Sequence, residues 1–206
     1  MEYYKSLQLH YEKRLAEHGP TAKGMDWPNA DDLEKRFNVL TSVIDFTQSS
    51  SLLDLGCGVG LLVDHLTHRQ LMHKFTYLGV DISTKMIEFA KEQHTSLPFE
   101  VRDILLKPYH ENQFDYIIMN GLLTEKQDMS QAQMKDFAQQ IITSAFRSCS
   151  KGISFNVMSS HVDWKRDDLF HWELDDVVSF MVKNCSRKIT IMMDYGLFEY
   201  TVHLKK

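Results

Sequence analysis

The sequence predicts an α/β fold built on a doubly wound, mainly parallel β-sheet. One observation is the stretch 52–60, an apolar strand that ends in a glycine-rich turn and leads into an apolar helix face. Another is that strand-like runs at 75–82 and 98–104 alternate with helical stretches, which is typical of parallel sheets. A third is the almost continuous apolar run at 114–120, as expected of a parallel strand buried on both faces. With 206 residues, the chain is long enough for one domain (1–206) and hardly for two.

The composition is that of an ordinary globular protein, with 43% hydrophobic and 25% charged residues. A net charge of −5 disfavours a long phosphate-binding surface, and therefore disfavours nucleic acid as a partner. The three cysteines, Cys57, Cys149 and Cys185, are widely spaced, which predicts reduced thiols and no metal site. No apolar run approaches membrane-spanning length and the N-terminus lacks a signal peptide's apolar region, so we expect a cytoplasmic protein without a membrane partner.

Two helices are expected ahead of the glycine-rich turn. Residues 2–18 carry apolar side chains at four-residue spacing on one face. Asp31, with Glu34 three residues later, predicts the N-cap of a second helix. The irregular segment between the helices holds Trp27, an aromatic side chain that we expect to contact substrate.

The turn itself has the pattern Asp54-x-Gly56-x-Gly58-x-Gly60. Glycines let a ligand approach the backbone, and free N–H groups at a helix start attract a negative group. The dinucleotide fingerprint G-x-G-x-x-G would need a third glycine where Leu61 stands, and the Gly-Lys-Ser/Thr ending of a phosphate-binding P-loop is absent. An acid beside the turn suits a ligand with a cationic end and no pyrophosphate, such as S-adenosylmethionine.

This stretch resembles the first motif of the class I S-adenosylmethionine-dependent methyltransferases. The resemblance implies that the cofactor is bound by the turn residues Asp54, Gly56, Cys57, Gly58 and Gly60. It also implies a seven-stranded sheet closed by a C-terminal antiparallel hairpin, and residues from about 35 to the C-terminus fit that order of elements.

The ends of the second and third strands carry the next candidates. Asp81 lies 21 residues beyond the last glycine of the turn, where an acid in doubly wound folds accepts hydrogen bonds from ribose hydroxyls. Ile82 beside it is expected to pack on an adenine face. By the resemblance, Asp103 receives the adenine amino group and Ile104 contacts the ring.

The fourth strand ends at Asn120, which should face the reacting sulfonium because ligands lie outside the carboxyl ends of parallel strands. The sequence from Asn120 to Leu123 is not the Asn/Asp-Pro-Pro-aromatic motif expected of a nucleic-acid amino-methyltransferase. It also lacks the acidic ligands expected of a metal-dependent catechol-type enzyme.

The C-terminal third contains the most open assignments. A fifth strand is expected at 152–158, and the loop after it holds His161, a candidate general base, and Asp163, which could orient it or contact substrate. Two final strands, 188–194 and 198–204, flank Tyr195, a further candidate for the substrate pocket.

The sequence therefore predicts a methyltransferase core at 49–206 preceded by helices at 1–48 that form a lid, complete the core by packing, or do both. The acceptor is expected to be a small molecule methylated on O or N. A protein or RNA methyltransferase and a non-catalytic S-adenosylmethionine-binding module remain as alternatives, and Leu61 weakens a nicotinamide dehydrogenase. The sequence gives no indication of the oligomeric state.

Overall fold

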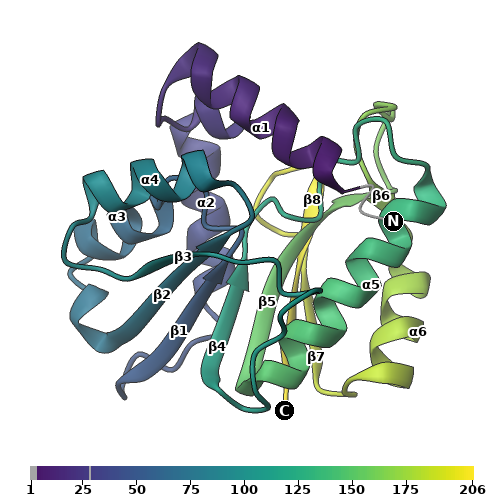
Figure 1. Cartoon of the computed structure of the whole chain (residues 1–206). Coiled ribbons are helices and arrows are strands. Elements are labelled where there is room, and N and C mark those ends of the chain that lie inside the picture. Colours follow the sequence, from purple (N-terminus) through teal and green to yellow (C-terminus); the bar gives the residue numbers. More distant parts are fainter. Residues whose placement is uncertain (1–3, 28) are drawn as a thin grey trace.

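The computed structural model describes residues 4–27 and 29–206. One sheet forms the centre of this part of the chain (Figure 1), with the strand order β3-β2-β1-β4-β5-β8-β7 and a short β6 paired to β5. The strands are β1 Ser50–Leu55, β2 Phe75–Asp81, β3 Phe99–Val101, β4 Phe114–Met119, β5 Cys149–Ser159, β6 His171–Trp172, β7 Ile189–Met192 and β8 Glu199–Lys205. Strands β1 to β5 pair in parallel, and β8 runs antiparallel to both β5 and β7.

Helices cover both faces of the sheet, which confirms the doubly wound α/β fold. The helices are α1 Lys5–His18, η1 Lys23–Met25, α2 Ala30–Thr41, α3 Leu61–His68, η2 Met72–Lys74, α4 Thr84–Gln93, α5 Gln131–Ser148 and α6 Leu174–Asn184. Successive side chains of a strand point to opposite faces. Accordingly, Leu53 packs in the core beneath α5 and α6, while its neighbour Leu52 packs in the core beneath α2, α3 and α4.

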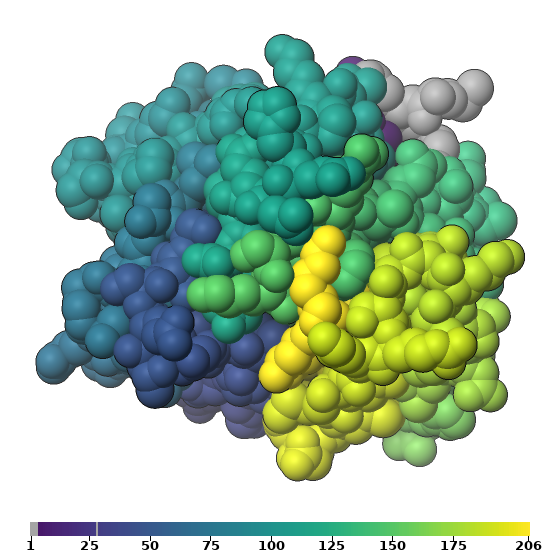
Figure 2. All heavy atoms as spheres, turned by 90° about the horizontal axis from the view of Figure 1, so that it is seen from below, coloured from purple at the N-terminus to yellow at the C-terminus, as the bar shows by residue number. Residues whose placement is uncertain are grey.

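Helix α1 belongs to neither layer. It lies across the edge of the sheet at which β1, β2 and β4 end (Figure 1). At the opposite edge, seen in Figure 2, the last residues of the chain lie between the start of β5 and the segment that precedes β7. There Lys206 donates its backbone N–H to Lys151, and Lys188 Nζ donates to the Lys206 carbonyl. None of the described helices is long and apolar enough to cross a membrane.

The C-terminal strands form the predicted antiparallel hairpin. Ser83 and Ser130 cap α4 and α5 through their side chains. The predicted Asp31 cap is wrong: Asn29 caps α2, because its Oδ1 accepts the Asp32 N–H at 2.8 Å. The two-residue strand β6 was not predicted, since so short a pairing leaves no periodicity in the sequence. The expected start of the first helix at residues 2 and 3 lies outside the described residues.

Candidate functional site

A cavity of about 860 Å³, partly open to solvent, lies between α1 and the carboxyl ends of β1, β2 and β4. A second hollow of about 390 Å³ adjoins it and reaches the end of β3. Six residues line both: Tyr4, Gly56, Asp81, Ile82, Leu122 and Phe137. We call the strand ends with the turn 56–60 the floor of the site, and residues 4–27, which contain α1 and η1, its roof.

The glycine-rich turn of the floor is held by its own backbone. Gly56 and Cys57 both donate N–H hydrogen bonds to the Val80 carbonyl, at 2.8 and 3.0 Å, and Gly58 donates to Asp81 Oδ2 at 3.1 Å. Gly60 donates to the Cys57 carbonyl at 3.0 Å. The expectation that these donors are free to attract an anion is therefore wrong at these four positions. The turn instead fixes the strand ends, and with them the two buried acids.

Asp54 is the first of these acids, and it is buried at the end of β1 on the wall of the cavity. The Tyr77 hydroxyl donates to its Oδ2 at 2.9 Å. Burial raises the pKa of Asp54 to about 7. The nearby Asp81 also raises this pKa, whereas the hydrogen bond from Tyr77 lowers it. The carboxyl group is therefore poised to ionise when a cation binds beside it.

Asp81 ends β2 and also faces the cavity. Its Oδ1 accepts the Ser83 N–H at 2.8 Å and its Oδ2 accepts the Gly58 N–H at 3.1 Å. Burial raises its pKa, and these backbone donors oppose the rise. A carboxylate offers about four lone-pair positions, so Asp81 keeps the capacity to accept two hydroxyl groups.

The second hollow brings together the residues predicted to hold an adenine ring. Ile82, Asp103 and Ile104 all line it. Asp103 Oδ1 accepts the Leu105 N–H at 2.9 Å, and Oδ2 accepts the Tyr4 hydroxyl at 2.6 Å. The roof thus reaches down to the end of β3.

The end of β4 presents a buried acceptor to the cavity. Asn120 lines the cavity, and its Oδ1 is buried with no hydrogen-bond donor among residues 4–27 and 29–206. The next residue, Gly121, has a φ of +75°, and a Cβ there would lie 2.6 Å from Trp27 Cζ2. Glycine at 121 therefore lets the Trp27 ring of the roof lie directly against the floor.

Trp27 is held from behind by a buried polar network. The Arg36 guanidinium carbon lies 4.2 Å from the centroid of the Trp27 ring. Arg36 Nε contacts both carboxylate oxygens of Glu199, at 3.0 and 2.9 Å, and Asn156 Nδ2 donates to Glu199 Oε1 at 3.0 Å. Asn156 Oδ1 in turn accepts the Gly121 N–H at 2.8 Å. The network therefore joins α2, β5 and β8 to the aromatic wall of the cavity.

The roof is tied to the rest of the molecule by side chains. Glu12 Oε1 accepts the Ser83 hydroxyl at 2.8 Å, and Glu12 Oε2 lies 3.0 Å from Lys85 Nζ. Met25 contacts the floor at Gly58, where a Cβ would lie 2.8 Å from its Sδ. Roof and floor therefore meet at each side of the cavity.

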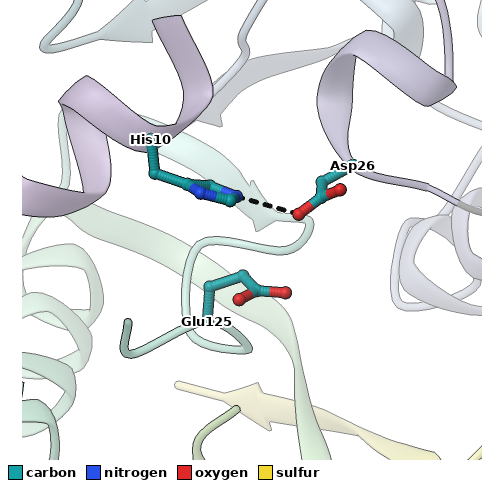
Figure 3. A group of neighbouring side chains, drawn as sticks. All are labelled: His10, Asp26 and Glu125. Carbon is teal, nitrogen blue, oxygen red and sulfur yellow. Dashed lines mark hydrogen bonds and ion pairs between the residues drawn. The ribbon is translucent and has the colours of Figure 1, made fainter. Parts of the chain in front are cut away.

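Figure 3 shows a further cluster between roof and floor, made by His10 of α1, Asp26 after η1 and Glu125 after β4. Their ligand-type atoms lie within 4.8 Å of one another, and His10 Nε2 is 2.9 Å from Asp26 Oδ2. Arg14 Nε lies 2.9 Å from Asp26 Oδ1 and supplies a positive charge there. Burial, Asp26 and Asp168 raise the pKa of Glu125 to about 7. His10, Arg14 and Asp26 thus form an ion-paired group within the roof, and Glu125 of the core lies beside it.

The structure does not bring three of the predicted substrate and catalytic residues to the cavity. His161 and Asp163 are exposed and line neither hollow. Tyr195 is half-buried, and its hydroxyl contacts Thr201 Oγ1 at 3.0 Å and Glu199 Oε1 at 3.4 Å. Of the predicted substrate residues, Trp27 alone lines the cavity.

Sequence reasoning missed the residues that fasten the roof, namely Glu12, Arg36 and Glu199. Each pairs with a partner 71 or more positions away in the chain. Their only signal in the sequence is that a charged residue stands at a helix or strand position where the pattern otherwise places apolar side chains.

A doubly wound sheet with a cavity at the carboxyl ends of its strands, a glycine turn after β1 and an acid at the end of β2 defines a Rossmann-like nucleotide-cofactor site. Residues 46–187 match the family model described as a methyltransferase domain. The chain belongs to this family, and it is a class I S-adenosylmethionine-dependent methyltransferase.

Individual relatives agree with this assignment. A Mycobacterium tuberculosis protein named as a methyltransferase is 26% identical over 169 residues, which are 80% of this chain and 98% of that protein. Phosphoethanolamine N-methyltransferase 1 of Triticum aestivum is 34% identical over 89 residues, which are 41% of this chain and 17% of the wheat protein. The chain therefore matches only a small part of the wheat enzyme.

Solved structures show the same fold at low identity. The 1,6-didemethyltoxoflavin-N1-methyltransferase of Burkholderia thailandensis is 13% identical with a TM-score of 0.67, over 100% of this chain and 89% of that one. The Synechocystis magnesium protoporphyrin IX methyltransferase, solved with S-adenosylmethionine bound, is 13% identical with a TM-score of 0.61, over 100% and 94%.

Proposed function

We propose that this enzyme transfers the methyl group of S-adenosylmethionine to an N or O atom of a small molecule enclosed between roof and floor. The observation that carries the proposal is the cavity of about 860 Å³ beneath α1. Its lining of apolar and aromatic side chains with a few buried polar groups is typical of small-molecule sites. In this proposal the segment 1–48 closes the active site of the core at 49–206.

The residues of the floor suit the cofactor. Asp54 would accept hydrogen bonds from the ammonium group, and Asp81 would accept them from the ribose hydroxyls. Asp103 would accept a hydrogen bond from the adenine amino group, in the hollow that Ile82 and Ile104 also line. Asn120 Oδ1 is a buried acceptor that a bound donor group would satisfy. Gly56 and Gly58 leave the cavity wall free of side chains next to these groups.

When bound, S-adenosylmethionine supplies a methyl group already activated by a positively charged sulfur. The chain's contribution is alignment and exclusion of water. Holding two reactants in line lowers a barrier by roughly 7–11 kcal/mol. Trp27 and Met25 would exclude water above the end of β4 and the glycine turn, since both reach the floor at a glycine.

The names of relatives support a small acceptor. Curated relatives from wheat, Arabidopsis thaliana and Plasmodium falciparum are named phosphoethanolamine N-methyltransferases, although this chain covers 16–35% of their length. The two neighbours of similar fold are named as methyltransferases of magnesium protoporphyrin IX and of 1,6-didemethyltoxoflavin. Small molecules of unrelated chemistry thus recur around one fold.

The test is calorimetric titration of S-adenosylmethionine, S-adenosylhomocysteine and NAD, with Asp81→Asn as the variant. Asp81→Asn should weaken both adenosyl ligands roughly 30-fold or more, because buried hydroxyl groups lose a charged acceptor. The exposed Asp194→Asn is the matched control and should bind like the parent.

Methyl transfer is then measured as S-adenosylhomocysteine released with the low-molecular-mass fraction of a cell extract and with its macromolecular fraction. Turnover with the small molecules supports the proposal. Turnover only with the macromolecular fraction, or tight binding of NAD in place of the adenosyl ligands, would overturn it.

A further inference from the structure

The wall of the cavity carries no positive side chain. Among the described residues that line it, the charged ones are Asp54 and Asp81, and no lysine, arginine or histidine is present. Three backbone N–H groups of the glycine turn are bonded within the protein, those of Gly56 and Cys57 to Val80 and that of Gly58 to Asp81. A phosphate or carboxylate on the acceptor, held against Trp27, would lose its hydration without gaining a positively charged side chain of this wall, which is costly.

Two guanidinium groups close to the cavity do not change this balance. Arg102 lines the second hollow, and its Nε and Nη2 contact Glu100 Oε1 at 2.9 and 2.8 Å. Arg36 lies behind the Trp27 ring and does not line the cavity. Its charge is balanced by the buried Glu199, which its Nε contacts through both carboxylate oxygens. The ion pair therefore has no net charge, and it offers no unbalanced positive charge to an anion in the cavity.

The wall is instead rich in aromatic rings on the side away from the adenine hollow. Tyr11, Trp27 and Phe37 line the main cavity and not the second hollow. Trp27 stands against Gly121 at the end of β4, where ligands of this fold meet. Paired aromatic rings attract each other more than the area that they bury accounts for. These aromatic side chains therefore favour a flat aromatic acceptor.

Among residues 4–27 and 29–206, those that line the cavity include no group free to remove a proton from the acceptor. Burial raises the pKa of Tyr11 and of Cys57, so that both stay protonated. Asp54 and Asp81 are assigned to the cofactor, and His161 is exposed outside the cavity. A hydroxyl acceptor usually needs a base near the operating pH. An uncharged amine or ring nitrogen already presents a free lone pair.

From these observations we propose that the acceptor is an uncharged aromatic or heteroaromatic amine that lies against the Trp27 ring. The proposal rests on the proposed function and narrows its substrate class. The nitrogen lone pair forms the new N–C bond while the S–C bond breaks and leaves its electrons on sulfur. The positive charge passes to nitrogen, which then releases a proton to water, so that the products are the N-methylamine, S-adenosylhomocysteine and H⁺.

The test uses matched sets of ring compounds that differ in one group: an aminoquinoline, the corresponding hydroxyquinoline, and the same amine with an added carboxylate. Phosphoethanolamine is included as an anionic amine without a ring. Binding to protein saturated with S-adenosylhomocysteine is measured by calorimetry, and S-adenosylhomocysteine release is measured with S-adenosylmethionine. The amine should bind, the carboxylated amine should bind at least tenfold more weakly, and the hydroxyl compound should turn over at least tenfold more slowly than the amine.

Trp27→Ala should weaken amine binding about tenfold or more, and Trp27→Phe should restore part of it, because a smaller ring keeps the stacking surface. Trp164→Ala is the matched control, since Trp164 is 68% exposed. The proposal is overturned if phosphoethanolamine or the carboxylated amine binds best, or if no amine binds while the adenosyl ligands do. Failure of the adenosyl ligands themselves to bind would instead contradict the proposed function.

Discussion

The floor and the roof of the cavity are built by different physical means. The floor consists of strand ends joined by backbone hydrogen bonds, such as those from Gly56 and Cys57 to Val80. The roof is fastened by side chains, among them Glu12 to Ser83 and Tyr4 to Asp103. Backbone pairing in a sheet persists as long as the fold does, whereas side-chain contacts open locally at lower free energy. The floor is thus suited to hold a cofactor and the roof to admit and enclose an acceptor.

The largest effect is expected from removing the contacts that link Trp27 of the roof to the core. Arg36→Ala leaves Glu199 buried without its positive partner and removes the support behind Trp27. Breaking a buried ion pair from one side costs about 3–5 kcal/mol. We expect the free energy of unfolding, measured in urea, to fall by about that amount.

Arg187→Ala is the control, because Arg187 is exposed, and it should change stability by less than about 0.5 kcal/mol. Replacing both partners with apolar residues, Arg36→Met with Glu199→Leu, should recover much of the loss. A loss below about 1 kcal/mol for Arg36→Ala would mean that Asn156 and Tyr195 alone satisfy Glu199.

The same contrast explains how far the sequence predicts the molecule. The floor was predictable because its signals are local: the glycine spacing, the acid at the end of β2, and apolar runs that fix the strands. Asp54, Asp81 and Asn120 accordingly line the cavity as expected. The backbone partners of the turn were not predictable, because they depend on how β1 and β2 lie side by side.

The roof was predicted only as helices. Its fastening depends on pairs such as Glu12 with Ser83, which sequence spacing does not reveal. His161 illustrates the opposite error. Its place after β5 favoured a role at the site, yet the loop carries its side chain to the surface. Position after a strand sets the edge of the sheet on which a residue lies, but not the direction of its side chain.

A second prediction sharpens the role of the floor through pH. Burial raises the pKa of Asp54 to about 7, so the carboxyl group is mostly neutral below that pH and mostly ionised above it. The ammonium group of the cofactor prefers the carboxylate, so binding below pH 7 must release a proton. Affinity for S-adenosylhomocysteine should therefore rise about tenfold from pH 6 to pH 8, as measured by calorimetry at each pH.

Asp54→Asn should bind more weakly and lose most of this dependence. Tyr77→Phe removes a hydrogen bond that lowers the pKa of Asp54, so the midpoint should move to higher pH. A pH profile that is the same in Asp54→Asn and in the parent would assign the dependence to another group, with Asp81 the nearest candidate because burial raises its pKa too.

The smallest effect is expected where the roof is most lightly fastened. Glu12→Gln keeps the size of the side chain but removes the charge that pairs with Lys85, which is largely exposed. Exposed ion pairs contribute about 0–1 kcal/mol, so the roof should open only about two- to fivefold more often. Hydrogen exchange should show this as faster exchange of the amides of α1 with unchanged exchange in β1 and β4. Glu88→Gln on the exposed face of α4 is the control and should leave the exchange of α1, β1 and β4 unchanged. Equal acceleration in β1 and β4 would contradict the comparison, because roof and floor would then open as one unit.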